Sequence, residues 1–204
     1  MHALRRHHFH AILLPLALLA VGCAAVSAST RDTAGATKAN WEWPLRFSKH
    51  AMRVACYDTI GCRARYADVW QVYDAPDYRR PSSASIGPNY RDHMRGGHIA
   101  IVNFPEPMEI TWRSKDGTPL QARIDIGRIF QDELVRHNVP RERIPLDVTS
   151  LAPDTVHPDI VVEVNDRIVR VYMRSHIPVD HETKPGNRFS RFVSELIEVE
   201  TFHF

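Results

Sequence analysis

The sequence predicts an α+β fold, mainly an antiparallel β-sheet or sandwich with one packed amphipathic helix. Two pairs of segments alternate apolar and polar residues, and turn residues join the members of each pair. Such pairs predict β-hairpins, which are antiparallel by construction. Between the two pairs lies one stripe of apolar residues at helical spacing, which predicts a helix packed on the sheet.

The first predicted hairpin covers residues 108–113 and 120–126. Met108, Ile110 and Trp112 alternate with polar residues, and the turn sequence KDG follows. The second hairpin covers residues 160–164 and 169–173, with a turn at Asn165-Asp166 and with Arg167, Arg170 and Arg174 on its polar side. Residues 66–73 and 196–202 also alternate and are predicted as strands.

The predicted helix covers residues 126–137. Asp125 can cap its first turn, and the apolar stripe comprises Ile126, Ile129, Phe130 and Leu134. Asn138 and Pro140 then end it.

Residues 1–22 are predicted to be a lipoprotein signal peptide. Arg5 and Arg6 precede an apolar run at residues 11–21, about half of the ~20 residues that a membrane-spanning helix needs. The segment LAVGC, which ends at Cys23, resembles the lipobox of bacterial lipoproteins and implies a lipid on Cys23. The alternative is ordinary signal cleavage after the segment VSA at residues 26–28, which would leave a soluble chain.

Residues 23–40 are expected to be the lipidated cysteine and a flexible tether, because they are rich in Ala, Ser and Thr and lack hydrophobic periodicity. Residues 41–204 are expected to form a single periplasmic domain. By resemblance to lipoprotein sorting, Ala24 directly after the cysteine implies the outer membrane.

Removing Arg5 and Arg6 with the signal leaves 24 basic residues against 24 acidic ones. This neutrality argues against a nucleic-acid partner, which calls for a basic stripe to displace counterions from phosphates. Cys56 and Cys62 are expected to pair as a disulfide in an oxidising periplasm; two free thiols are the alternative.

Residues 74–97 are predicted to be a long loop, because prolines and glycines punctuate them. Aromatic residues and arginines gather on and around this loop, and these residue types dominate the energetics of protein interfaces. The predicted partner contacts are Trp70, Tyr73, Tyr78, Arg79, Arg80, Tyr90, Arg91 and Arg95. The alternative places Trp70 in the core and leaves the rest as a solvated loop.

No catalytic motif of the G-x-S-x-G, H-E-x-x-H or phosphate-loop kind is present, so we expect no enzymatic activity and no cofactor. The histidine pairs His93/His98 and His176/His181 lack the spacing of a zinc site, and no metal is predicted. The alternative is a membrane-proximal hydrolase, in which acids such as Asp58, Asp68 and Asp92 converge.

The order of segments resembles a bacterial lipoprotein family of unknown function, often encoded beside lipase effectors of the type VI secretion system. The resemblance rests on the lipobox, the start at Trp41, the strand DVWQVY, a loop with Gly96-Gly97, and the segment PEPMEITW. A helix and then IVVEV facing VRVY complete the order. It implies an immunity lipoprotein that binds and blocks a periplasmic phospholipase or other lipase. The competing hypothesis is a structural or assembly lipoprotein of the envelope, and the identity of the neighbouring gene would discriminate between the two.

Overall fold

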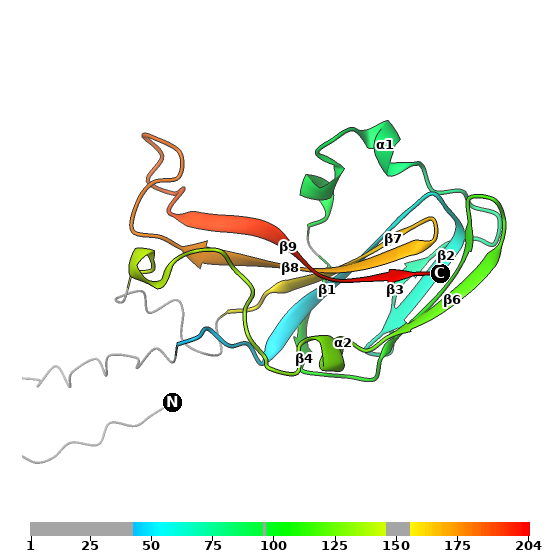
Figure 1. Cartoon of the computed structure of the whole chain (residues 1–204), viewed down its shortest axis with the longest axis horizontal. Coiled ribbons are helices and arrows are strands. Elements are labelled where there is room, and N and C mark those ends of the chain that lie inside the picture. Colours follow the sequence, from blue (N-terminus) through cyan, green and yellow to red (C-terminus); the bar gives the residue numbers. More distant parts are fainter. Residues whose placement is uncertain (1–42, 96, 146–155) are drawn as a thin grey trace, which may run out of the picture. The chain divides into compact units, whose positions relative to one another are not determined.

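The computed structural model describes residues 43–95, 97–145 and 156–204. The predicted signal peptide, Cys23 and the tether up to residue 40 lie outside these ranges. Within them the fold confirms the predicted class, a mainly antiparallel β-structure with few and short helices (Figure 1). No helix in the described ranges has both the length and the hydropathy that crossing a membrane requires.

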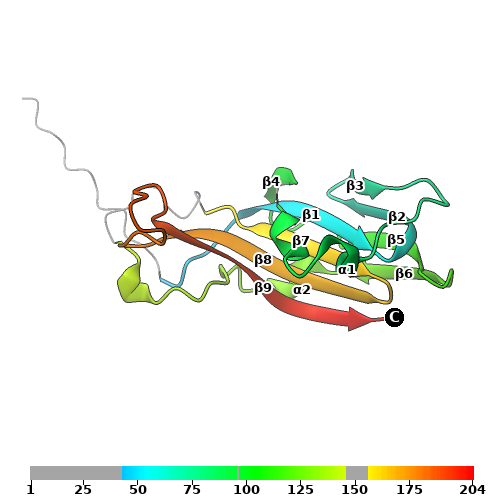
Figure 2. The same cartoon turned by 90° about the horizontal axis from the view of Figure 1, so that it is seen from above.

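Two sheets make up the fold (Figures 1 and 2). The first has the order β4-β1-β7-β8-β9, and the second has the order β3-β2-β5-β6. The strands of the first sheet are β1 (Lys49–Tyr57), β4 (His98–Val102), β7 (Asp159–Asn165), β8 (Ile168–Pro178) and β9 (Phe192–His203). Those of the second are β2 (Thr59–Tyr66), β3 (Val69–Tyr73), β5 (Met108–Ser114) and β6 (Pro119–Ile124).

Among the described strands, all pairs but one are antiparallel. The exception joins β1 and β7, which run parallel with Ala51 beside Asp159 and Tyr57 beside Asn165. β1 leaves the first sheet at Asp58 and continues directly into β2 of the second sheet, so one corner connects the two layers. The main core fills the space between the layers, where Val54 and Val162 belong to the same buried cluster as Ile110.

Both predicted hairpins are confirmed, as β5 with β6 and as β7 with β8. Met108, Ile110 and Trp112 are buried, as their alternation predicted. β9 contains the predicted strand at residues 196–202. The prediction of one strand over residues 66–73 was wrong, because Ala67 and Asp68 take positive φ values of 52° and 59°. They form a tight turn from β2 into β3, a geometry typical of two-residue hairpin loops.

The helix predicted over residues 126–137 was also wrong in extent. Only α2 (Ile126–Ile129) is helical, capped by the Asp125 side chain as predicted. After it, residues 130–132 form a turn and Glu133 takes a positive φ of 55°. The chain then forms a β-bridge between Leu134 and Arg46, and the amide of Val135 donates to the carbonyl of Leu45. Ile126, Ile129 and Phe130 of the predicted stripe are buried, whereas Leu134 is only half-buried and Val135 is buried instead.

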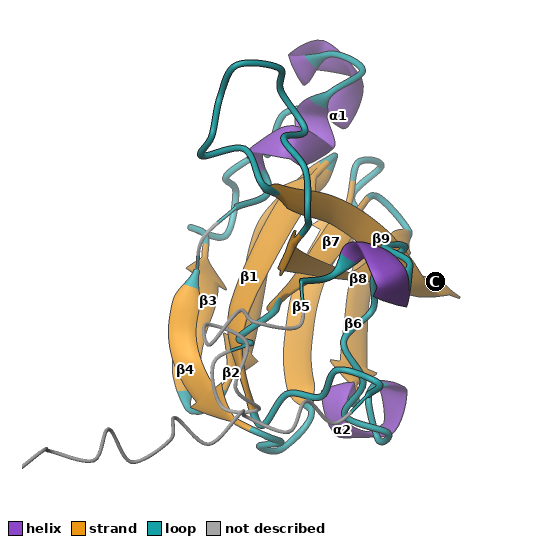
Figure 3. Ribbon diagram, turned by 90° about the vertical axis from the view of Figure 1, so that its left-hand side faces the viewer, coloured by secondary structure: helices purple, strands orange, loops and turns teal. Residues whose placement is uncertain are grey.

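The remaining helices are single turns at the edges of the fold (Figure 3). They are α1 (Ser83–Ile86) and the 3-10 helices η1 (Tyr90–His93) and η2 (Arg141–Arg143). The first two lie within the predicted loop at residues 74–97, which therefore has more local order than its Pro and Gly content predicts.

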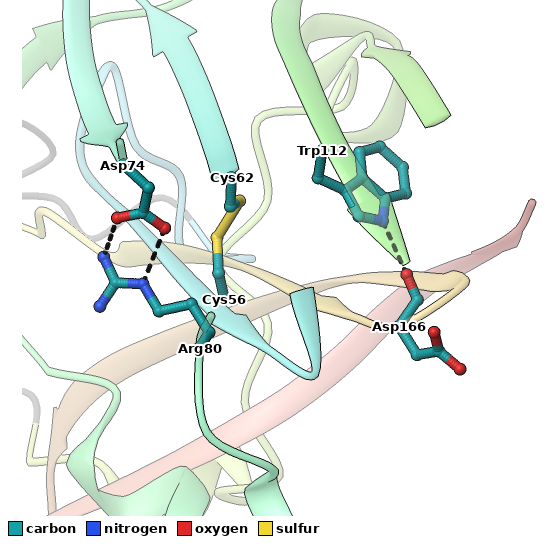
Figure 4. Close-up of a disulfide and its surroundings, with 6 residues drawn as sticks. All are labelled: Cys56, Cys62, Asp74, Arg80, Trp112 and Asp166. Atoms are coloured by element: carbon teal, nitrogen blue, oxygen red, sulfur yellow. Dashed lines mark hydrogen bonds and ion pairs between the residues drawn. A yellow bond between two sulfur atoms is a disulfide. The ribbon is translucent and has the colours of Figure 1, made fainter. Parts of the chain in front are cut away.

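The predicted disulfide is present and joins the two layers, since Cys56 lies on β1 and Cys62 on β2 (Figure 4). Both cysteines are buried in the main core. The bridge closes only the short corner around Asp58, so it removes little entropy from the unfolded chain.

Replacing both Cys56 and Cys62 with alanine is expected to lower the free energy of unfolding by about 2 kcal/mol. Urea denaturation of the variant and of the oxidised wild type measures the difference. Reducing the wild type with a thiol reagent should give a similar loss, and an unchanged midpoint after reduction would contradict the expectation.

Candidate binding surface

β3 is an edge strand of the second sheet, and it exposes two large aromatic side chains. Trp70 is 52% exposed and Tyr73 is 61% exposed. In the register of β2 with β3, Tyr73 pairs with Arg63 and Trp70 with Arg65. Cross-strand partners share one face of a sheet, and this face is opposite the buried Cys62 and Ala64. The alternative that placed Trp70 in the core was therefore wrong.

Two groups of rings and guanidinium groups are in contact, one on this face and one on the chain that follows β3. The Trp70 and Tyr73 rings meet edge to face with their centroids 5.0 Å apart. The Arg63 guanidinium lies 4.5 Å from the centre of the Tyr73 ring, and that of Arg80 lies 5.1 Å from the centre of the Tyr78 ring. We call Trp70, Tyr73, Tyr78, Arg63 and Arg80 the aromatic surface.

Asp74, directly after β3, links the two groups through Arg80 and Arg63; Figure 4 shows its contact with Arg80. Its buried carboxylate accepts two hydrogen bonds from Arg80, at 2.9 and 2.6 Å, and its carbonyl accepts one from Arg63 at 3.1 Å. Such a two-pronged contact fixes the plane of the guanidinium. The hydrogen bonds to Asp74 also raise the pKa of Arg80. Arg80 therefore belongs to the aromatic surface and also stabilises it through Asp74.

Gly61 fixes the position of Tyr78. Its amide donates to the Tyr78 carbonyl at 2.9 Å, and it takes a φ of 61° where the chain at Pro76 passes close by. A methyl group on this glycine would lie 2.5 Å from the Pro76 carbonyl oxygen, so a larger residue would push this segment away.

A shallow hollow of about 550 Å³ adjoins the aromatic surface. Arg63, Pro76 and Arg113 line it, together with Thr111 of β5 and Gln121 of the edge strand β6. Arg113 donates to the Pro76 carbonyl at 2.7 Å and to Asp77 at 2.8 Å, so the hollow has a fixed rim. The aromatic surface and this hollow together give the second sheet an uneven outer face that a protein partner could fill.

Two further residues from the predicted contact set, Tyr90 and Arg91, lie elsewhere. They pack over the outer face of the first sheet, where the buried side chain of Glu163 points away from the main core. Tyr90 donates to this carboxylate at 2.9 Å, Tyr172 donates at 2.7 Å, and Asn165 donates at 2.9 Å. The structure thereby gives Tyr90 and Arg91 an internal partner, and they are not part of the aromatic surface.

Burial raises the pKa values of both tyrosines, and the hydrogen bond to Glu163 adds to the effect. Their hydroxyls therefore stay protonated at neutral pH and serve as donors to the carboxylate. Arg91 adds a cation, with its Nε 3.7 Å from Glu163 Oε2 and its guanidinium over the Tyr90 and Tyr172 rings. Arg174, which the sequence placed on the polar side of its hairpin, is buried and donates to the carbonyls of Met94 and Arg91. These contacts clamp residues 90–94 onto the sheet.

We call Glu163 and the side chains that contact it the Glu163 cluster. It was not predicted from the sequence, although the sequence contains a signal for it. The strand IVVEV has no polar face apart from Glu163, which is typical of a strand buried on both sides. A single carboxylate in such a run calls for donors from another segment.

Arg79 is exposed between Tyr78 and Arg80, and its backbone forms a β-bridge with Ile60. The other predicted residues are dispersed. Arg95 is exposed, and its side chain donates to the carbonyl of Asp92. Asp58 and Asp68 lie in the turns that follow β1 and β2, and Asp92 lies in η1. Across the described ranges, no group of three or more His, Cys, Asp or Glu side chains is placed to hold a metal ion.

Comparisons with models of protein families, with curated proteins and with solved structures gave no match for this chain.

Proposed function

We propose that this chain is an envelope-anchored binding protein, and that the aromatic surface is where its protein partner docks. The observation that carries the proposal is the exposed pair of Trp70 and Tyr73 on an edge strand, flanked by arginines that are already held in place. Tyr, Trp and Arg dominate interface hot spots, because they bury large areas and still form polar contacts. Fixed side chains also lose less entropy on binding than mobile ones do.

The partner that we propose is a lipase or phospholipase delivered to the periplasm, which the chain would block by stoichiometric occlusion without turnover. Support for this identity comes from the family resemblance and the predicted export signal. An interface of standard size buries about 800 Å² on each partner. The outer face of the second sheet, with its aromatic surface and adjoining hollow, is a suitable site for such a contact.

Replacing Trp70 and Tyr73 with alanine is expected to weaken partner binding by about thirtyfold or more, the effect of losing roughly 2 kcal/mol. The test is titration calorimetry with the purified enzyme encoded next to this chain, followed by co-expression in the periplasm with survival as the readout. Both side chains are exposed, so the variant should unfold at the same urea concentration as the wild type.

The matched control is Phe189→Ala, which removes a side chain that is 75% exposed in a different part of the fold. It should bind as the wild type does. Arg80→Ala is not a suitable probe, because it leaves the buried Asp74 without its cation. If the wild type neither binds the neighbouring enzyme nor protects cells, the proposed partner is wrong. Normal binding by the double variant would show instead that the proposed surface is wrong.

The anchor has its own test, Cys23→Ala. The wild type is expected to incorporate radiolabelled palmitate and to fractionate with membranes, whereas the variant should be unlabelled and soluble in the periplasm. An unlabelled wild type would favour ordinary cleavage at residues 26–28.

A further inference from the structure

The connection between β8 and β9 combines exposed aromatic rings with basic side chains. Phe189 is 75% exposed, and Phe192, at the start of β9, is 43% exposed. Lys184, Arg188 and Arg191 are exposed close by, and none of the three forms an ion pair with an acid of the described ranges. We call these five residues the basic tip.

The acids of the same connection are already engaged. Asp180 pairs with Arg143 at 3.0 Å and with His181 at 2.8 Å. Glu182 accepts a hydrogen bond from the amide of Gly186 at 3.0 Å. No acid of the described ranges therefore neutralises the three cations of the basic tip, and Arg188 lies over the Phe189 ring, 4.8 Å from its centre. All three can attract an external anion.

The connection holds its shape without help from the core. The buried Ser190 accepts from the amide of Lys184 at 2.9 Å and donates to the carbonyl of Asn187 at 2.7 Å. The amide of Thr183 donates to the Ser190 carbonyl at 3.1 Å. This internal bonding fixes the loop and leaves the Phe189 ring in water, so an apolar surface that covers the ring would gain free energy without a large ordering cost.

The basic tip lies at the end of the domain where the chain enters it. Arg141 of η2 lies over the Trp43 ring, 5.5 Å from its centre, and Arg143 of the same turn pairs with Asp180. Figures 1 and 2 show the β8–β9 connection and η2 together at this end, whereas β3 lies toward the other end. The aromatic surface and the basic tip thus lie toward different ends of the domain.

We propose that the basic tip docks on an anionic phospholipid surface, with Phe189 in the interfacial region and the cations against lipid phosphates. Aromatic rings beside Lys and Arg are the combination that membrane interfaces select. A lipid on Cys23 and a flexible tether over residues 23–40, as the sequence predicts, would hold this end of the domain at an r.m.s. distance of roughly 23 Å from the anchor. The proposal rests on the envelope anchor of the proposed function but not on the identity of the protein partner.

The test places a tryptophan at the tip of the full chain, as Phe189→Trp. The protein is mixed with phosphatidylglycerol vesicles whose acyl chains are brominated, and the fluorescence of the wild type is subtracted. The added tryptophan should be quenched, because bromine quenches only at close range. Adding Arg188→Gln and Arg191→Gln should lower the ratio of docked to undocked protein about 25-fold, at about fivefold for each arginine. Raising the salt concentration to about 0.5 M should weaken docking in the same direction.

The matched control is Phe204→Trp, since Phe204 is exposed at the C-terminus, toward the other end of the domain (Figure 1). It should not be quenched. Equal quenching at both positions, no quenching at the tip, or quenching that neither the arginine changes nor salt reduces would each overturn the proposal. Crosslinking of an unquenched position 189 to an envelope protein would overturn it in favour of a protein contact. If Phe189→Trp does not fold, Phe192→Trp gives the same reading.

Discussion

Replacing Glu163 with alanine is expected to lower the free energy of unfolding by about 4 kcal/mol. The change leaves the hydroxyls of Tyr90 and Tyr172 and the amide of Asn165 without their acceptor, and it removes the anion that faces Arg91. Glu163 and Tyr172 are buried, so water cannot freely replace the lost acceptor. Urea denaturation, followed by circular dichroism, measures the loss.

Two control variants separate the loss of the hydrogen-bond acceptor at Glu163 from the loss of its charge and from the loss of any carboxylate. Glu163→Gln keeps an acceptor oxygen and most of the volume, so it should cost about 2 kcal/mol. Glu200→Ala removes a surface carboxylate that pairs with Arg128 and should cost less than about 1 kcal/mol. A loss for Glu163→Ala as small as that for Glu200→Ala would show that the cluster does not hold residues 90–94 in place.

The second large effect is expected at Trp112, whose replacement by alanine should cost about 4 kcal/mol. The ring is buried in the core between the two sheets. Its Nε1 donates to the Asp166 carbonyl in the β7–β8 turn at 2.7 Å (Figure 4). The variant therefore loses packing and leaves a carbonyl unpaired at the same place.

Trp112→Phe keeps an aromatic ring but not the hydrogen-bond donor. Its stability should lie between those of the wild type and Trp112→Ala, with a loss of about 2 kcal/mol. Denaturation midpoints of the three proteins give the order directly. Equal stability of the phenylalanine variant and the wild type would mean that the hydrogen bond across the sheets contributes nothing measurable.

The hairpins β5–β6 and β7–β8 could be predicted because each depends on local alternation and an adjacent turn. The length of α2 could not, since the course of residues 133–135 is decided by pairing with residues 45–47, far away in the sequence. The turn at Ala67-Asp68 was hidden for a related reason: these residues are not glycines, yet both adopt positive φ. The pairing of β1 with β7 could not be predicted either, because no local sequence pattern indicates which two distant strands pair.

The candidate site was predicted in part. Residue type alone selected Trp70, Tyr73 and Tyr78 as candidate contacts, because large aromatic side chains near a Pro-rich loop have few apolar residues against which to pack. Residue type could not separate Tyr78 from Tyr90, because the difference is the buried Glu163, more than seventy residues further along the chain. Asp74 was likewise missed as the support of Arg80, since its role depends on the fold of the loop.

The parallel pair of β1 and β7 also sets the order in which the fold can be completed. During synthesis, which proceeds from the N-terminus, β1 is made early. Ala51 can pair with Asp159 only after β7 has been made. Until then β1 carries an open edge and an uncovered apolar face, while β2, β3, β5 and β6 can pair with one another as they appear. Contacts so distant in sequence slow folding and prolong the exposure of unpaired edges. Chains shortened before β7 should therefore aggregate or be degraded rather than accumulate as a smaller domain.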